Sequence, residues 1–109
     1  MPLTIADLMS KMPGAFVPEK AQGLDVILQF KFSGSEPGEW YAAIKDGKVD
    51  VQKGAHEKPT MTLMADSDDY IALFTGKLDP MQAFMAGKLK LTGDLNLAMK
   101  MTQFFKMRG

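Results

Sequence analysis

Apolar and polar residues alternate between Leu24 and Ser33, which gives this chain its clearest pattern. A period of two is typical of a β-strand, because successive side chains point to opposite faces of a sheet. The stretch therefore predicts a long strand with one strongly apolar face. Its apolar positions are Leu24, Val26, Leu28, Phe30 and Phe32.

The next two apolar-alternating stretches cover residues 39–45 and 48–53. Asp46 and Gly47 lie between them, and an Asp-Gly pair in that place is a strong signal for a two-residue hairpin. Together with the first strand these stretches predict an antiparallel meander. Trp40, Ala42 and Ile44 fall on one side of the second strand.

Two further strands are predicted at residues 60–65 and 88–92. Met61, Leu63 and Ala65 share a face of the first, and Leu89 and Leu91 lie opposite Lys88 and Lys90 in the second. The alternation in both is typical of half-buried strands.

The apolar period changes to that of a helix in four places. Thr4 and Asp7 predict a capping box with Asp in place of Glu, and the helix that they open is expected to end at Pro13-Gly14. Pro18 opens a second short turn.

Asp66 is expected to cap the second helix, which runs to about Thr75, and Asp79-Pro80 starts the third. The apolar face of this third helix is marked by Met81, Phe84 and Met85. Asp94 caps a last helix, from Leu95 to about Met107.

The sum of these elements is one α+β domain over residues 1–109. It contains a five-stranded, mainly antiparallel (mixed) sheet, and amphipathic helices cover its one apolar face. The length fits a single domain with one core, and neither a repeat nor a linker interrupts it. Residues 1–14 include Asp7 and no long apolar run, so neither a signal peptide nor a membrane span is expected.

Composition excludes several classes of protein. The net charge is zero, which disfavours nucleic acid as a partner, and the absence of cysteine excludes disulfides and thiolate metal sites. We expect a cytoplasmic protein. Residues 70–109 nevertheless carry six Lys or Arg against two Asp, a net charge of +4. Either this half meets anionic head groups in a transient membrane contact, or the charge is simply solvated.

Candidate catalytic chemistry is sparse. His56 is the one histidine and lies in a polar loop, where we expect it to be solvated. The cluster of Asp66, Asp68 and Asp69 lacks the glycine and glutamate of a calcium loop, so helix capping explains it better. We expect no catalytic residue, no metal and no cofactor. An enzyme stays open only if acids distant in sequence meet in a dry cleft.

The second half of the chain resembles a known family. Three runs carry the resemblance: TGKLDP at residues 75–80, FMAGKLKLTGD at 84–94 and LAMK at 97–100. They are similar to the sterol carrier protein type 2 family, and Trp40 matches a recurrent tryptophan in the looser first half. The resemblance implies a hydrophobic tunnel between sheet and helices. It also implies a non-catalytic lipid-binding or lipid-transfer role, with fatty acids, fatty acyl-CoA, phospholipids or sterols as ligands.

The last helix is apolar around most of its circumference. Packing against the sheet alone would leave part of this apolar surface uncovered, so the helix needs a second apolar neighbour. A bound lipid, another helix or a partner chain would serve. The ten methionines and seven phenylalanines fit an adaptable wall, although methionine also fills ordinary cores. The alternative function is an interaction module in which this helix forms a homodimer or partner-docking face.

We therefore expect a ligand pocket lined by aromatic and apolar side chains from several elements. Its expected members are Phe32, Trp40, Phe74, Phe84, Met85, Leu97, Met101, Phe104 and Phe105. The candidates for contact with a ligand head group are Lys88, Lys90, Lys100 and Gln103.

Overall fold

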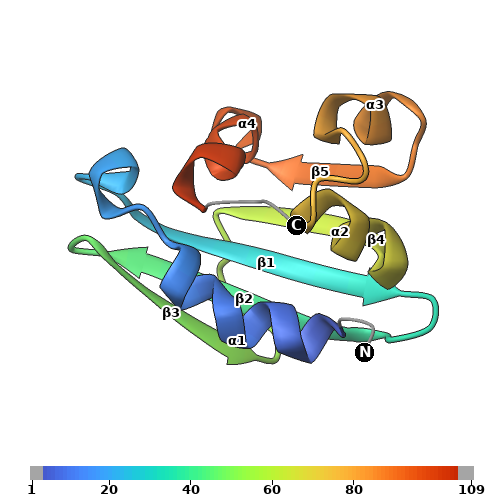
Figure 1. The fold of residues 1–109 in the computed structure, drawn as a ribbon. Helices are drawn as coiled ribbons and strands as arrows, with labels where there is room; N and C mark the ends of the chain where they lie inside the picture. Colours follow the sequence, from blue (N-terminus) through green and yellow to red (C-terminus); the bar gives the residue numbers. More distant parts are fainter. Residues whose placement is uncertain (1–3, 106–109) are drawn as a thin grey trace.

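The computed structural model describes residues 4–105, except for the side chains of residues 98, 99, 101 and 102. Figure 1 shows the sheet and the helices that surround it. In chain order the elements are α1 (Ile5–Ala15), the 3-10 helix η1 (Pro18–Ala21), β1 (Asp25–Ser33), β2 (Gly38–Lys45), β3 (Lys48–Lys53), β4 (Met61–Asp66), α2 (Ser67–Phe74), α3 (Pro80–Met85), β5 (Leu89–Gly93) and α4 (Leu95–Phe104).

The five strands form one sheet in the order β3-β2-β1-β4-β5. β1 and β4 run parallel, whereas the other three neighbouring pairs are antiparallel. The predicted mixed, mainly antiparallel sheet is therefore confirmed. Asp46 and Gly47 both have positive φ, 55° and 73°, as a two-residue hairpin turn with the twist of its strands requires.

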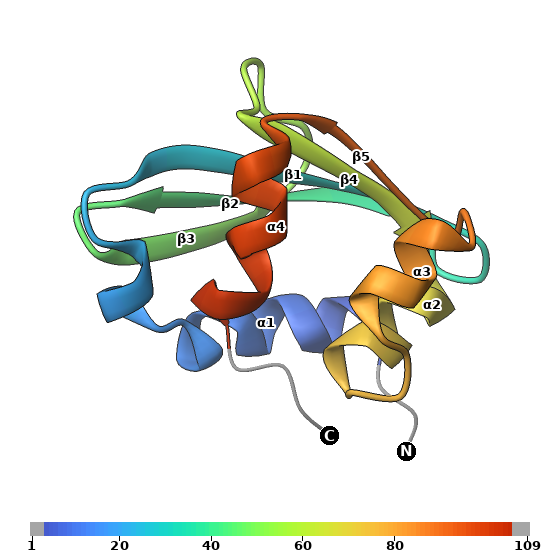
Figure 2. The ribbon, with the colours of Figure 1, turned by 90° about the horizontal axis from the view of Figure 1, so that it is seen from above.

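All four α-helices in residues 4–105 lie on one side of the sheet, as Figure 2 shows from above. The strand faces that point toward them carry the alternating apolar side chains. In the sheet register Phe30 lies between Trp40 of β2 and Leu63 of β4. The largest fully buried side chains on this side are Ile5, Leu8, Met9, Met12, Leu28, Phe30, Ile44, Met61, Leu63, Tyr70 and Phe104.

Two predicted helix ends are wrong. α1 continues past Pro13 to Ala15. Proline lacks an N–H, but the Pro13 carbonyl accepts a hydrogen bond from the Phe16 N–H, and this bond closes the last turn. α4 ends at Phe104, because Phe105 is extended and forms an isolated antiparallel bridge with Phe16. Met107, where the helix was expected to end, lies outside the described residues.

The expected apolar face of α3 is also wrong. Met81, Phe84 and Met85 face outward, and Ala83 is the residue of α3 that is buried. Gln82 is the one polar residue in this helix, so periodicity did not select a face. The small side chain of Ala83 is the one that packs into the core, and the larger residues remain at the surface.

Candidate ligand-binding site

Large apolar side chains reach the surface around β5. Among the described side chains of residues 4–105, four large apolar ones are exposed. Their exposed fractions are 50% for Met81, 45% for Phe84, 79% for Met85 and 53% for Leu95. We call these four residues the α3–α4 surface. Leu89 and Leu91 alternate with Lys88 and Lys90 along β5; Leu89 is buried and Leu91 is half-buried. Large apolar side chains are therefore exposed on both of the helices that flank this edge strand.

Two aspartates fix the helices on either side of β5. The Asp79 carboxylate accepts a hydrogen bond from the Gln82 N–H at 3.0 Å, and the Asp94 carboxylate accepts one from the Leu97 N–H at 3.1 Å. Both act as N-caps, as the sequence predicts. The Asp94 N–H also donates to the Thr60 carbonyl at 3.0 Å, which ties the start of α4 to the start of β4.

The far end of α4 is held by the segment that follows α1. The Val17 N–H donates to the Phe104 carbonyl at 2.7 Å, and the Phe16 and Phe105 rings lie 5.7 Å apart between centroids. Phe104 and Phe105 are both buried. α4 is thus anchored at both ends while Leu95 remains exposed.

The structure brings five of the predicted lining residues into one continuous core: Phe32, Phe74, Leu97, Phe104 and Phe105. Trp40 is half-buried at the edge of that core, with the Lys53 ammonium 5.8 Å from its ring centroid. Phe84 and Met85 are exposed at the surface, whereas those five residues are buried. The Met101 side chain lies outside the described residues.

The predicted head-group residues divide between the two faces of the sheet. Lys90 pairs with Met64 and points away from the helices, whereas Lys100 and Gln103 are exposed on α4. Lys88 and Lys90 border an open depression of about 540 Å³, to which the outward-facing Lys31 and Met64 contribute together with core residues and Asp69 of α2. Its lining is Lys31, Phe32, Ser33, Met64, Ala65, Asp66, Asp69, Gly87, Lys88 and Lys90. Lys100 and Gln103 are thus the head-group candidates that lie on the helical side of the sheet.

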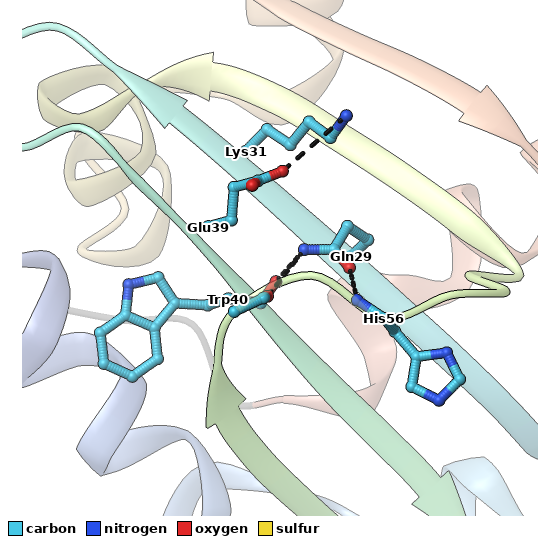
Figure 3. Close-up of polar contacts among 6 residues, drawn as sticks. Gln29, Lys31, Glu39, Trp40 and His56 are labelled. Carbon is cyan, nitrogen blue, oxygen red and sulfur yellow. Dashed lines mark hydrogen bonds and ion pairs between the residues drawn. The ribbon is translucent and has the colours of Figure 1, made fainter.

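Sequence reasoning missed the role of Gln29, which is 1% exposed on the strand face opposite the helices. Its Nε2 donates to the Trp40 and Gly54 carbonyls at 2.9 and 3.1 Å, and its Oε1 accepts from the His56 N–H at 2.8 Å. Figure 3 shows the contacts to Trp40 and His56 beside the exposed Lys31–Glu39 ion pair. A glutamine in an alternating strand carries no local signal of this role.

His56 belongs to this structural group and is half-buried, not solvated as the sequence suggested. Its Nδ1 accepts a hydrogen bond from the Lys58 N–H at 3.1 Å, and its ring meets Tyr41 edge-on at 5.2 Å. Among the residues that the structure describes, no three His, Cys, Asp or Glu side chains are grouped to hold a metal ion. Over the same residues, no helix is long and apolar enough to cross a membrane.

Burial raises the pKa of the Tyr70 hydroxyl well above its ordinary value of 10.0. Tyr70 packs against Phe32 and Phe30 with ring centroids 5.0 and 5.7 Å apart, so the apolar frame disfavours the phenolate. In the shared core this side chain acts as a neutral aromatic.

Comparison with known proteins decides the family. A sequence model described as the SCP-2 sterol transfer family matches residues 13–106. The chain belongs to this family. The resemblance drawn from the sequence is therefore confirmed, and the solved structures of SCP2 proteins share the fold. Solution NMR coordinates of palmitated SCP2L2 from Aedes aegypti superpose with a TM-score of 0.77 at 23% identity, covering 97% of each chain.

Two curated relatives of this SCP-2 chain are longer proteins. Hydroxysteroid dehydrogenase-like protein 2 from Xenopus tropicalis is 46% identical over 76 residues, which are 69% of this chain and 18% of the relative. Sterol carrier protein 2 from Homo sapiens is 40% identical over 68 residues, 62% of this chain and 12% of the relative. The chain thus spans about a fifth or less of the length of these two relatives.

Proposed function

We propose that this SCP-2 domain binds an apolar lipid, of the fatty-acid or fatty-acyl type, and carries it without catalysing a reaction. The ligand chain lies between the helical layer and the β4–β5 side of the sheet. Membership of the SCP-2 sterol transfer family supports a lipid cargo. A relative with the same fold was solved in palmitated form, which supports a single acyl chain.

The observation that carries the proposal is the position of the α3–α4 surface. The large exposed apolar side chains in the described part of the chain lie on α3 and at the start of α4, the helices before and after β5. An exposed apolar group of this kind marks a binding site more often than chance. On α4, the same helix that exposes Leu95 buries Leu97 and Phe104 in the core.

The energetics require no polar contact to the ligand. Burial of one methylene group yields about 0.8 kcal/mol, so ten methylenes yield roughly 8 kcal/mol before the cost of ordering. Walls rich in methionine and phenylalanine re-pack around different chains, so we expect broad selectivity.

The test begins with native mass spectrometry of the protein as purified. Mass increments that match fatty acids or phospholipids are expected, and saturable binding of a fluorescent fatty acid after delipidation should follow. If no lipid co-purifies and the fluorescent fatty acid does not bind saturably, the proposal fails.

A pair of variants locates the ligand. Phe84→Gln places a polar group on the helical side, and Met64→Gln places one on the opposite face of the sheet. Both residues are partly exposed, so both variants should fold. Fatty-acid affinity is expected to fall in Phe84→Gln and to stay unchanged in Met64→Gln. The reverse result would place the ligand in the depression that Met64 and Lys90 line.

A further inference from the structure

The methionines of this chain differ sharply in their exposure to solvent. Met81 and Met85 lie one helical turn apart on α3 and are 50% and 79% exposed. Met9, Met12 and Met61 lie in the core and are each 1% exposed. Two thioethers on the same short helix are therefore open to solutes, and the core encloses these other three.

Methionine carries all of the sulfur in this chain, because the sequence contains no cysteine. Hydrogen peroxide oxidises a methionine side chain to the sulfoxide. The sulfur electron pair attacks one peroxide oxygen, the O–O bond breaks, an S–O bond forms, and the second oxygen leaves as water. The oxidant must reach the sulfur directly, so Met81 and Met85 should react well before the buried methionines.

We propose that Met81 and Met85 form a site of reversible oxidation, at which peroxide lowers the affinity of the domain for its apolar ligand. The proposal rests on the proposed lipid-binding function, since both residues belong to the α3–α4 surface. A sulfoxide is polar, so oxidation makes two of the four exposed apolar side chains on this surface hydrophilic. The loss of apolar area weakens the contact with an acyl chain.

Oxidation at these two positions should leave the fold intact. Met81 and Met85 lie outside the buried core, to which α3 contributes Ala83. The start of α3 is held by the Asp79 carboxylate, which accepts a hydrogen bond from the Gln82 N–H at 3.0 Å. A sulfoxide on either methionine side chain removes neither the burial of Ala83 nor this cap. Ligand affinity therefore changes without unfolding, as a reversible switch requires.

The first measurement is peptide mapping by mass spectrometry after brief treatment of the folded full chain with hydrogen peroxide. Sulfoxide is expected first at Met81 and Met85, later at the partly buried Met64, and last at the core methionines. The urea midpoint should not change while oxidation is confined to α3. Oxidation of the core methionines as early as the α3 pair would overturn the proposal.

The second measurement is binding of a fluorescent fatty acid before and after the same treatment. Affinity should fall by about fivefold or more, and it should recover when methionine sulfoxide reductases remove the added oxygen. Full affinity with both sulfoxides in place would overturn the proposal. If the untreated protein does not bind the fatty acid saturably, the proposed function fails and the effect on affinity with it, whereas the peptide map still decides whether α3 is the site of oxidation.

Leucine variants locate the effect, because leucine replaces methionine at nearly constant volume and has no sulfur to oxidise. In Met81→Leu with Met85→Leu, fatty-acid affinity should be the same before and after peroxide, whatever its starting value. Met64→Leu is the matched control, since Met64 pairs with Lys90 and points away from the helices. This control should keep the full response to peroxide. A double variant that still loses affinity on oxidation would place the sensitive methionine elsewhere and overturn the proposal.

Discussion

Gln29 holds the backbone of His56: its Oε1 accepts a hydrogen bond from the His56 N–H at 2.8 Å. The amide nitrogen of the same side chain donates to the carbonyls of Trp40 and Gly54. These contacts fasten the connection between β3 and β4 where it passes over β1 (Figure 3). The parallel pairing of β1 with β4 depends on where this connection ends, because Thr60 then meets Ile27 through both its N–H and its hydroxyl.

Gln29→Ala should therefore destabilise the fold more than its strand position suggests. Three hydrogen bonds are lost, and part-buried backbone groups lose their partners at about 1 kcal/mol each. We expect a loss of about 3 kcal/mol in the free energy of unfolding, measured by urea denaturation. Gln52→Ala is the matched control, since Gln52 is exposed and bonds only to the Asp50 side chain at 2.9 Å. Equal effects of the two variants would contradict the role given to Gln29.

Local patterns predicted most of this fold because most of its signals are local. The alternation in β1, the Asp46-Gly47 turn and the aspartate caps of α2, α3 and α4 each depend on residues within a few positions of one another. The strands and helix starts therefore agree with the structure. The family resemblance supplied the expectation of a tunnel, which no single pattern carries.

The errors occur where distant segments meet. Phe105 leaves the helix because Phe16, far away in sequence, pairs with it. Gln29 is buried because a later loop crosses its strand face. Lys90 and Phe84 were expected at one ligand, but the pleat of β5 turns Lys90 away from the helices. Periodicity cannot report such pairings, because it describes one segment at a time.

Gly93→Ala should be far more harmful than Gly87→Ala. Gly93 ends β5 and Gly87 precedes it; their φ values are positive, 87° and 78°, so an alanine is strained at either position. A Cβ on Gly93 would lie 2.6 Å from the Thr60 carbonyl oxygen, whereas one on Gly87 meets nothing within 4 Å. We expect Gly87→Ala to cost about 1–2 kcal/mol and Gly93→Ala clearly more, by thermal or urea unfolding. Similar costs would mean that the backbone at Thr60 yields easily.

Tyr70 should stay protonated at alkaline pH as long as the protein is folded. Burial raises its pKa above the unfolded value of 10.0, so the native state keeps a proton that the unfolded state loses. Its contribution to stability is present below pH 10 and is lost as pH rises further. In Tyr41→Phe, Tyr70 is the one remaining phenol. Its phenolate absorbance should rise together with loss of the near-ultraviolet circular dichroism; ionisation near pH 10 without unfolding would contradict its burial.

Asp7 should contribute to acid sensitivity with the opposite sign. Hydrogen bonds from Thr4, backbone first, hold the pKa of the Asp7 carboxyl below its ordinary value of 3.8. The stabilisation is present above that value and is lost as pH falls through the lowered pKa. Asp7→Asn should unfold at lower urea than the unaltered protein at neutral pH, and the difference should shrink in strong acid. Asp25→Asn, at an exposed strand position, controls for the change in charge.

Lys100 should distinguish ligand head groups. It is exposed on α4, on the same side of the sheet as the proposed ligand, whereas Lys90 points to the other side. A partly solvated ion pair is worth up to about 1 kcal/mol, so Lys100→Glu should weaken binding of a fatty acid by about two- to fivefold. Binding of the fatty alcohol of equal length should not change, because it has no carboxylate. Lys90→Glu should leave both affinities as they are. If Lys90→Glu weakens fatty-acid binding and Lys100→Glu does not, the carboxylate lies on the outer face of the sheet.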